Sequence, residues 1–587
     1  MPRLRRTRGQ LRGSPQFRLR AGFVLIAMVI SVFGARLVQL QGVDPGSYAA
    51  MAAAEGTVRA VLPAERGDIL DRNGEPLADS VDGLMVVADP KEIDEEDTAD
   101  IARFLSQRLS VDYIDTLARL RERGSQFEYI ARRVPSTLAN DVLKEAEDRG
   151  IKGLSTRRDP VRIYPAHDVA ANVLGFIGTD QPFGGLEEAF DTYLSGQDGE
   201  ARYEVGGGNR IPLGTNEITK PVDGADLDTT LDRDLQWYTQ RVLRSAVVKA
   251  RGDSGVAIIM DSRTGEILAD ADYPTYDAAN PADYPDTDRG ARTISEPYEP
   301  GSVEKVLTLS SLIDAGRMTA RTRFTVPGQL ARQDRVIKDY FEHGTIRLTL
   351  AGILAKSSNI GTVLAADRFK TGELRAYLNA FGLGQKTEVG LLSESRGILP
   401  DPSMWTSQTE DRIAFGQSLA VTPVQMAAAV NTIANGGVRI SPSLIKGTAT
   451  RDDGAQFGTD VATTRRVVSA HAARQTTLMM ERVVDPEDGV APGAQVAGYR
   501  VAGKTGTAQR VSPDCGCYDG TFTVSFGGFA PADEPRFTIY VAIQNPRNGG
   551  GGGSVAGPVF SQLMNFTLHR YGVAPTGRKP TVLPVEW

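Results

Sequence analysis

Cysteine and histidine are scarce in this chain of 587 residues, which contains two cysteines and four histidines. Cys515 and Cys517 form a single C-x-C, so there is no disulfide framework, and without a second pair this is a poor metal site. The histidines are scattered singly: His167, His343, His471 and His569. A histidine-based metal site and a Ser-His-Asp triad are therefore disfavoured, and we expect neither a metal nor a cofactor.

An excess of positive charge is also missing, because the net charge is −7 and the isoelectric point lies near 5.5. This balance argues against nucleic acid as the main partner. The apolar fraction of 41% and the charged fraction of 24% are ordinary for globular protein. At 587 residues the chain is too long for one ordinary domain, so we expect two or three.

A long apolar run stands near the N-terminus. Residues 1–20 carry seven arginines and no acid, and the uncharged stretch Ala21–Ala35 follows, which extends through Leu40 to twenty residues. About twenty helical residues span a bilayer, and an arginine excess marks the cytoplasmic side. We therefore predict a cytoplasmic basic tail over 1–20, an uncleaved membrane anchor over 21–40, and an extracytoplasmic remainder.

Two other interpretations of this run compete with the anchor. A cleavable signal peptide would use the alanine-rich residues 49–55, which lie well beyond the apolar run, whereas a cleavage site normally follows it closely. A buried core helix would not be preceded by seven arginines without an acid. Length and charge asymmetry favour the anchor.

The first half after the anchor mixes strands and helices. Residues 65–80 alternate apolar and polar side chains around Asn73-Gly74, which predicts a β-hairpin. Residues 92–150 have helical patterning, and residues 184–200 resemble a short amphipathic helix. A composition shift over 220–236 predicts a domain boundary and a helix that begins near Arg233.

The second half predicts a sheet with helices packed against it. Residues 254–274 favour two strands, and long helical segments follow around 302–315, 347–367, 372–381 and 422–436. Strand-like pieces, a glycine-rich loop over 548–558 and a last helix end the chain. This order predicts an α+β layering with an antiparallel sheet.

The stretch GYRVAGKTGTAQ, from Gly498 to Gln509, fits two motifs at once. Gly498–Thr505 matches the G-x-x-x-x-G-K-[ST] pattern of a phosphate-binding loop, and the overlapping K-T-G is one of three boxes of penicillin-reactive serine enzymes. A phosphate loop needs a strand, a flexible turn and then a helix. Here the four variable positions, Tyr499–Ala502, alternate in character as in a strand, and Pro513 soon after the motif argues against a helix start. The stretch therefore indicates a strand over 501–509 instead.

The penicillin-reactive interpretation predicts two more boxes. A serine acyl enzyme without histidine needs another base, and Ser302 with Lys305 supplies Ser-x-x-Lys at a helix start. Ser357 with Asn359 supplies Ser-x-Asn, and Lys504 opens K-T-G. Each box alone is weak, whereas their order along one globular stretch beyond an anchor is a strong signal.

With these boxes in place, the chain resembles the class B penicillin-binding proteins, single-anchor D,D-transpeptidases of bacterial cell-wall synthesis. RGDILDRNGEPLA over 66–78, the segment 162–178 and GGLEEAFDTYLSG over 184–196 are similar to the front-half boxes of this family. YEPGSVEK, KSSN and GKTGTAQ are similar to its catalytic boxes, and residues 415–437 to the helix between the second and third. The anchor together with FGARLVQLQ at its end, over 33–41, is similar to the division-specific (FtsI-type) branch.

The resemblance implies a penicillin-binding, serine β-lactamase-like domain over 223–587, with a central antiparallel sheet flanked by helices. It also implies an elongated N-terminal pedestal of the dimerisation type over 41–222. The implied reaction is septal cross-linking of peptidoglycan stem peptides that end in D-Ala-D-Ala, blocked covalently by β-lactams. The implied partners are an FtsW-type membrane glycosyltransferase and other division proteins.

The resemblance also implies residue roles in acylation. Ser302 attacks the D-Ala-D-Ala carbonyl and Lys305 takes its proton. Ser357 relays a proton to the leaving D-Ala, and Asn359 binds the substrate amide and helps to position Lys305.

The third box and the oxyanion hole complete the implied site. Lys504, Thr505 and Thr507 hold the terminal carboxylate, with Gly506 in the same substrate-binding box. The backbone N–H groups of Ser302 and Thr507 form the oxyanion hole.

Alternatives to a septal transpeptidase stay open at this point. They are an elongation-branch transpeptidase, a β-lactamase or β-lactam sensor, and a catalytically silent scaffold that recruits a glycan polymerase. Two departures also stand out. Glu304 lies inside the first box and should point away from Ser302 on a helix, and Cys515 with Cys517 either pair in a tight ring or remain thiols.

Overall fold

The structure is a computed structural model, and it divides into two compact units. It describes residues 15–39, 57–179, 181–206, 209–210, 217–333, 335–512 and 515–587. One unit comprises Met1–Pro63 with Gln197–Val222, and the other comprises Ala64–Gly196 with Asp223–Trp587. The alternative cleavage site at 49–55 lies outside the described residues.

The first unit contains the apolar helix α1, Pro15–Val38. Its stretch Gln16–Val38 contains a window of 18 residues with a mean hydropathy of 2.2 and is long and apolar enough to cross a membrane. The helix begins six residues before the predicted position 21, because Gln16 to Arg20 contain good helix formers that extend it toward the N-terminus. Arg18 and Arg20 therefore lie on the helix.

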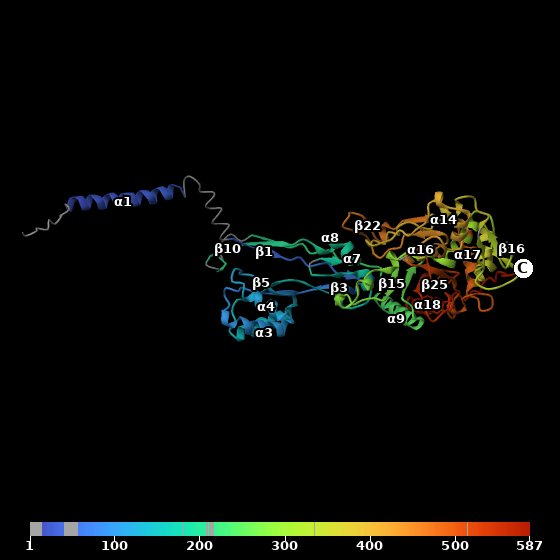
Figure 1. Cartoon of the computed structure of the whole chain (residues 1–587), viewed down its shortest axis with the longest axis horizontal. Coiled ribbons are helices and arrows are strands. Elements are labelled where there is room, and N and C mark those ends of the chain that lie inside the picture. The colour runs from blue at the N-terminus through green and yellow to red at the C-terminus, as the bar shows by residue number, and fades with distance from the viewer. Residues whose placement is uncertain are drawn as a thin grey trace, which may run out of the picture. The chain divides into compact units, whose positions relative to one another are not determined.

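An antiparallel sheet completes the first unit (Figure 1). Its central strand β10 pairs with β1 along six residue pairs and with the shorter β11 and β12. The bounds are β1 Thr57–Leu62, β10 Gly199–Gly206, β11 Asn209–Arg210 and β12 Glu217–Thr219.

The second unit begins with the predicted hairpin, which is confirmed. Strands β2 (Ile69–Leu70) and β3 (Pro76–Val81) pair antiparallel around Asn73-Gly74, and Gly74 has a φ of +84°. Asp71 Oδ1 accepts hydrogen bonds from the backbone N–H groups of Asn73 and Glu75, which closes the turn. The sheet is completed by β7 Val161–Ile163 and β13 Leu227–Asp228.

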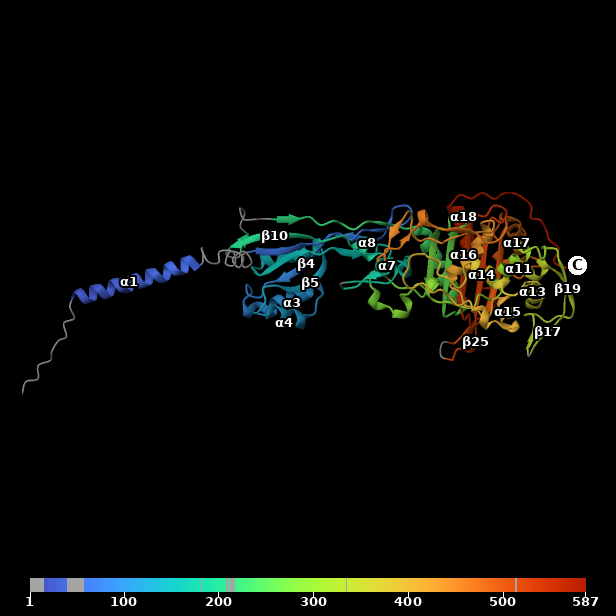
Figure 2. The same ribbon diagram turned by 90° about the horizontal axis from the view of Figure 1, so that it is seen from above.

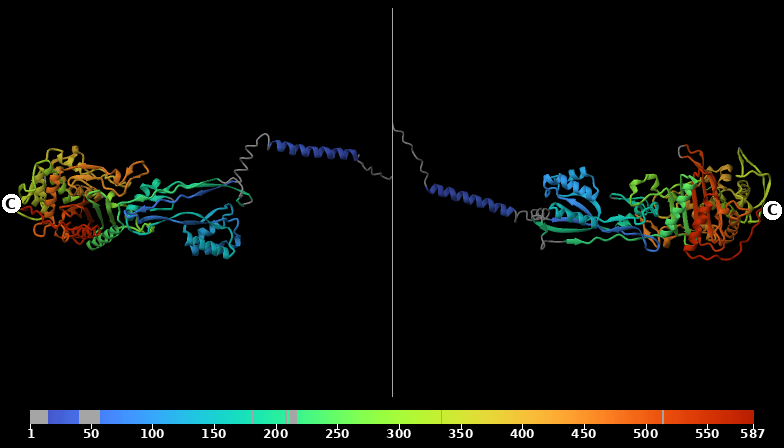
Figure 3. Two further views of the ribbon diagram at one scale, coloured as in Figure 1. Left: turned by 180° about the vertical axis from the view of Figure 1, so that it is seen from behind. Right: turned by 90° about the horizontal axis from the view of Figure 1, so that it is seen from below.

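The predicted helical region over 92–150 forms a separate small core (Figure 3). Three helices, drawn in blue, pack on a three-stranded sheet whose middle strand is β4. Strand β5 interrupts the predicted helical stretch because its sequence EYIARRVP is rich in β-formers. The bounds are α3 Thr98–Leu109, α4 Tyr113–Leu120, α5 Ser136–Asp148, β4 Gly83–Ala88, β5 Glu128–Pro135 and β6 Leu154–Arg158.

The single helix predicted over 184–200 is wrong, since the structure has two short helices. They are α7 (Gly185–Ala189) and α8 (Asp191–Ser195), and the fully buried Phe190 stands between them with a φ of −119°. The short elements around them are α6 Ala171–Leu174, β8 Phe176–Ile177 and β9 Pro182–Phe183.

The core of the second unit is a five-stranded antiparallel sheet in the order β15-β14-β26-β25-β24, which confirms the predicted sheet. Helices α9 and α18 contact it from one side and α16 and α17 from the other (Figure 1). Helix α9 begins at Arg233, as predicted. The bounds are β14 Ser254–Asp261, β15 Ile267–Tyr273, β24 Ala502–Val511, β25 Tyr518–Ala530, β26 Phe537–Gln544, α9 Arg233–Ala250, α16 Pro423–Ala434, α17 Ala470–Val483 and α18 Ala556–Arg570.

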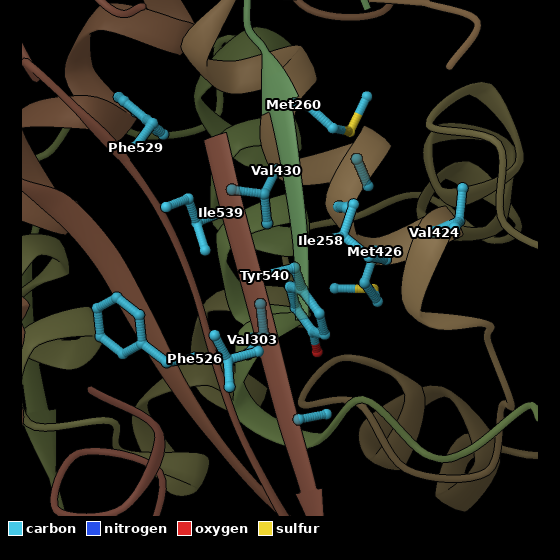
Figure 4. Packing of buried hydrophobic residues seen from close by; sticks show 14 of the residues in the cluster. Ile258, Met260, Val303, Val424, Met426, Val430, Phe526, Phe529, Ile539 and Tyr540 are labelled. Atoms are coloured by element: carbon cyan, nitrogen blue, oxygen red, sulfur yellow. The ribbon is translucent and has the colours of Figure 1, made fainter. Parts of the chain in front are cut away.

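Side chains from α16 fill the space above this sheet (Figure 4). Figure 4 shows Met426 and Val430 close to Ile258 and Tyr540, which are directly opposite each other on β14 and β26. Tyr540 lies against Gly527 on β25, where an added Cβ would come within 2.9 Å of the ring. This face of the sheet is thus covered mainly by apolar side chains, and Asn431 of α16 accepts a hydrogen bond from Thr538 on β26 at 2.7 Å.

Cys515 and Cys517 form a disulfide with each other in the chain segment that lies between β24 and β25.

The remaining elements of the second unit surround this core. The other helices are α10 Arg292–Ser295, α11 Lys305–Asp314, α12 Leu350–Ala355, α13 Asn359–Ala366, α14 Glu373–Ala380 and α15 Ser407–Ile413. The other strands are β16 Arg323–Val326, β17 Leu330–Arg332, β18 Arg335–Ile337, β19 Ile346–Thr349, β20 Val438–Ile440, β21 Ala449–Thr450, β22 Gln456–Phe457 and β23 Thr464–Arg466.

Candidate active site

The three predicted boxes meet at one cleft with a volume of about 720 Å³. Side chains from every box line it, and Lys305 and Lys504 are fully buried behind its wall. Figure 2 shows that the start of β25 and strand β17 project on the same side of this unit. The lining residues are Gly301, Ser302, Tyr340, Lys356, Ser357, Asn359, Phe415, Gln417, Asp488, Gly489, Val490, Thr505, Thr507, Gln509, Phe522 and Gly551–Ser554.

The first box lies in a short 3-10 turn, Gly301–Val303, that runs directly into α11. Gly301 has a φ of +56°, and its N–H donates to the carbonyl of Gly416 at 2.9 Å, so the turn is tied to the neighbouring segment. A Cβ at position 301 would come within 2.9 Å of the Thr507 carbonyl oxygen. Glycine therefore lets Ser302 approach the edge strand β24.

The second box breaks the helix that the sequence predicted over 347–367. Ser357 has a φ of +57°, which ends α12, and the hydroxyl of Ser358 accepts a hydrogen bond from Gly361 N at 2.8 Å, which caps α13. A serine hydroxyl competes with the helical hydrogen bonds, so two serines in a row favour this break. The break places Ser357 and Asn359 at the cleft.

The third box is part of the edge strand β24, Ala502–Val511, which confirms the strand predicted over 501–509. A phosphate-binding loop is excluded, because the residues around Lys504 form a strand and no helix follows them directly. Thr505 is buried and Thr507 is exposed, and both line the cleft. The loop nitrogen of Gly552 lies 3.4 Å from Thr507 Oγ1 and donates to it.

Lys305 is joined to the second box. Its Nζ donates to the carbonyl oxygen of Ser357 and to Asn359 Oδ1, each at 2.7 Å. Burial lowers the pKa of Lys305 to about 7, and the charges of Asp339 and Glu304 oppose this shift only in part. An amine with this pKa is substantially neutral near pH 7, which a general base requires.

Lys504 is also fully buried, and its Nζ donates to Ser357 Oγ at 2.9 Å and to the carbonyl and hydroxyl oxygens of Thr505, each at 3.1 Å. Burial lowers its pKa well below the usual value, and the nearby charge of Lys305 lowers it further. Ser357 therefore bridges the two lysines, with its carbonyl facing Lys305 and its hydroxyl facing Lys504.

Glu304 is fully buried within the first box, and its Oε1 accepts a hydrogen bond from Thr308 Oγ1 at 2.6 Å. Burial raises its pKa well above the usual range, while Thr308 and Lys305 oppose the shift. Among the described residues Glu304 Oε2 has no hydrogen-bond partner.

Several cleft residues were missed by sequence reasoning. The helix predicted over 422–436 is confirmed by α16, but Phe415 and Gln417, which precede it in the family-like segment 415–437, were not singled out and line the cleft. Thr422 is the N-cap of α16, and Pro423 is its first residue, as is typical of a helix start. Tyr340, Asp488 and the glycine-rich loop reach the cleft from segments without a catalytic pattern of their own.

Comparison with known proteins identifies the family to which the chain belongs. Residues 255–565 match the family described as the penicillin-binding protein transpeptidase domain. The chain belongs to the penicillin-binding proteins. Residues 61–182 match the penicillin-binding protein dimerisation domain, and a dimerisation domain before a transpeptidase domain confirms the predicted class B membership.

Relatives of this penicillin-binding protein match nearly its full length. Penicillin-binding protein PbpB of Mycolicibacterium smegmatis is 33% identical over 97% of this chain and 94% of its own. Peptidoglycan D,D-transpeptidase FtsI of Escherichia coli is 32% identical over 95% of this chain and 92% of its own. The penicillin-binding protein is thus a serine-type transpeptidase of peptidoglycan cross-linking, as predicted.

Solved structures agree with the predicted fold class. Penicillin-binding protein 3 of Mycobacterium tuberculosis, in complex with aztreonam, has a TM-score of 0.69 and 30% identity, and covers 90% of this chain and 100% of its own. A peptidoglycan synthetase of Bifidobacterium adolescentis has a TM-score of 0.72 at 29% identity, over 90% of this chain and 100% of its own.

Proposed function

We propose that this penicillin-binding protein cross-links peptidoglycan stem peptides at the septum, with Ser302 as the nucleophile. The observation that carries the proposal is the hydrogen-bonded connection of Lys305, Asn359, Ser357 and Lys504 beside Ser302 in one cleft. The substrate is a stem peptide that ends in D-Ala-D-Ala. Support for a septal role comes from the FtsI name of a relative that matches almost the whole chain.

Acylation begins when Ser302 Oγ attacks the carbonyl carbon of the penultimate D-alanine. Neutral Lys305 accepts the hydroxyl proton, and the ammonium that forms keeps its hydrogen bonds to the Ser357 carbonyl and Asn359 Oδ1. The N–H groups of Ser302 and Thr507 stabilise the oxyanion, usually a large contribution in acyl transfer. The low pKa of Lys305 supports this assignment.

Ser357 Oγ gives its proton to the leaving D-alanine and regains one from the Lys305 ammonium, so that Lys305 is neutral again. Because Lys504 Nζ donates a hydrogen bond to Ser357 Oγ, it stabilises the transient negative charge on this oxygen. Thr505 and Thr507 face the cleft and bind the terminal carboxylate, with Gly506 between them, while Lys504 acts on the carboxylate from behind them. An amine of a second stem peptide then attacks the acyl carbonyl carbon and gives a proton to Lys305. The ester bond to Ser302 Oγ breaks, Ser302 regains its proton from Lys305, and the new amide bond is the cross-link.

We also propose how the chain is organised at the membrane. Residues 21–40 anchor it, the arginine-rich N-terminus lies in the cytoplasm, and the cleft lies outside, which the charge asymmetry around α1 supports. Residues 41–222 form the pedestal and 223–587 the transpeptidase domain, which the two family matches support. The partner that supplies glycan strands is an FtsW-type membrane glycosyltransferase, together with other division proteins.

The test uses the full-length chain in detergent, a fluorescent penicillin and the mass of the adduct over hours. We expect a stable adduct that Ser302→Ala abolishes and that Ser403→Ala, an exposed serine outside the cleft lining, retains. Rapid turnover of the adduct would indicate a β-lactamase. An adduct that persists in Ser302→Ala would contradict the assignment of the nucleophile.

A further inference from the structure

Asp339 is a buried carboxylate that lies between β18 and β19, about twenty residues before the second box. Its side chain is 0% exposed, and it does not line the cleft. A buried charge needs partners to offset its desolvation, so the contacts of this carboxylate show what it organises.

Both carboxylate oxygens of Asp339 are used at the start of α13. Oδ1 accepts hydrogen bonds from the backbone N–H groups of Asn359 at 2.6 Å and Ile360 at 3.0 Å. Oδ2 accepts from the Ser358 hydroxyl at 2.7 Å and lies 3.0 Å from His343 Nε2. The Asp339 side chain therefore binds three consecutive residues: Ser358 and Asn359 of the second box, and Ile360 directly after them.

The neighbouring residue holds the other side of Asn359. Asn359 Nδ2 donates to the carbonyl oxygen of Lys338 at 3.1 Å, while Asn359 Oδ1 accepts from Lys305 Nζ at 2.7 Å. The amide side chain is thus fixed by Lys338 at one end and presents its oxygen to the proposed base at the other. Through Asn359, the pair Lys338-Asp339 determines where the Lys305 amine lies.

We propose that Asp339 is a positioning residue of the transpeptidase site, which holds Ser358 and Asn359 so that Asn359 keeps Lys305 in place beside Ser302. This inference rests on the proposed roles of Ser302 and Lys305. Asp339 touches neither the cleft nor the nucleophile, and it acts only through the second box.

The charge of Asp339 has a second effect on Lys305. Asp339 and Glu304 raise the pKa of Lys305 against the effect of burial, and Lys504 is the neighbouring cation. His343 faces the carboxylate from the same segment and shares it with the second box. Replacing Asp339 by a neutral residue therefore lowers the pKa of Lys305 and moves the pH range in which the amine becomes neutral toward lower pH.

The experiment compares Asp339→Asn with wild type in the full-length chain. The rate constant of acylation by a fluorescent penicillin is measured from about pH 5.5 to about pH 9, with the thermal midpoint of each variant. Asp314→Asn is the matched control, because its carboxylate also accepts from a backbone N–H, of Ser469, and a hydroxyl, of Tyr377, but outside the cleft. Displaced catalytic groups lose about tenfold to hundredfold in rate, and we expect a loss of this size in Asp339→Asn.

We further expect the rising limb of the pH profile to move to lower pH in Asp339→Asn and to stay in place in the control. A wild-type rate and profile in a folded Asp339→Asn protein would overturn the inference, as would a slower rate with an unmoved limb. If Asp339→Asn does not fold, Ser358→Ala decides: a slower acylation supports the inference, and an unchanged rate overturns it. The proposed function is tested separately by Ser302→Ala, whose adduct persists only if that function is wrong.

Discussion

At the scale of single residues, the proposed role of Lys305 as the base predicts how acylation depends on pH. Its pKa of about 7 arises from burial, so the fraction of neutral amine grows as the pH rises through about 7. We predict that acylation of the wild type increases over this range. Lys305→Arg should lower the rate by about 10²- to 10⁴-fold at every pH, because arginine keeps its proton. Stopped-flow acylation kinetics check this, and a Lys305→Arg protein with near wild-type rates would contradict it.

Two other residues, Asp270 and Asp272 on β15, link stability to pH. Burial raises the pKa of Asp270 to about 7 and that of Asp272 well above its usual value, and one oxygen of each lacks a hydrogen-bond partner among the described residues. The folded chain therefore holds protons that the unfolded chain releases near pH 3.8. The stabilisation that these bound protons provide is complete below pH 3.8, the usual pKa of aspartate, and is lost as the pH rises through the pKa values of the folded chain.

The consequence for Asp270 is a measurable slope. We predict that the free energy of unfolding falls by up to about 1.4 kcal/mol per pH unit and per group between about pH 4 and pH 7. Asp270→Asn should reduce this slope, since its side chain does not titrate. Chemical denaturation at several pH values provides the measurement, and equal slopes in both proteins would refute the assignment.

At the scale of elements, the site depends on how closely the 3-10 turn at 301–303 approaches β24. A Cβ added to Gly506 would lie 2.2 Å from Ser525 Oγ, 2.9 Å from the Pro300 carbonyl oxygen and 3.0 Å from Val303 Cγ2. We predict that Gly506→Ala separates the turn from the strand, destabilises the fold by about 1–3 kcal/mol and slows acylation. Gly290→Ala is the control, because nothing lies within 4 Å of its added Cβ. Thermal midpoints and acylation rates check the pair, and equal behaviour of the two variants would count against this packing.

At the scale of the whole molecule, α1 and the cleft belong to different compact units. The helix that is long and apolar enough to cross a membrane thus supplies no residue to the cleft. We predict that deletion of residues 1–38 moves the protein from the membrane to the soluble fraction and leaves penicillin acylation within about twofold of the full chain, since the anchor supplies no catalytic group. Fractionation and adduct mass test this, and a deleted protein that still sediments with membranes would show a second attachment site.

Much of the fold could be predicted because its elements carry local patterns. The hairpin around Asn73-Gly74, the start of α9 at Arg233 and the strand over 502–511 each follow from turn residues, helix formers or alternation within a few positions. The predictions were wrong where a buried contact competes with a local pattern. The helical pattern over 347–367 is interrupted because Ser357 and Ser358 make contacts that a continuous helix would not allow.

The sequence alone determined the apolar N-terminal helix, the order of the three boxes and the proposal of a serine–lysine site, since these depend on residue type and spacing. Only the tertiary structure decided how the boxes act together. It placed Lys504 Nζ 2.9 Å from the hydroxyl of Ser357, 147 residues away in sequence. It also placed the Asp339 carboxylate within hydrogen-bond distance of Ser358 in the second box. It also paired Cys515 with Cys517, which the sequence left open. The physical reason is that these polar contacts are set by which side chains are buried together, and burial is a property of the packed sheet and helices.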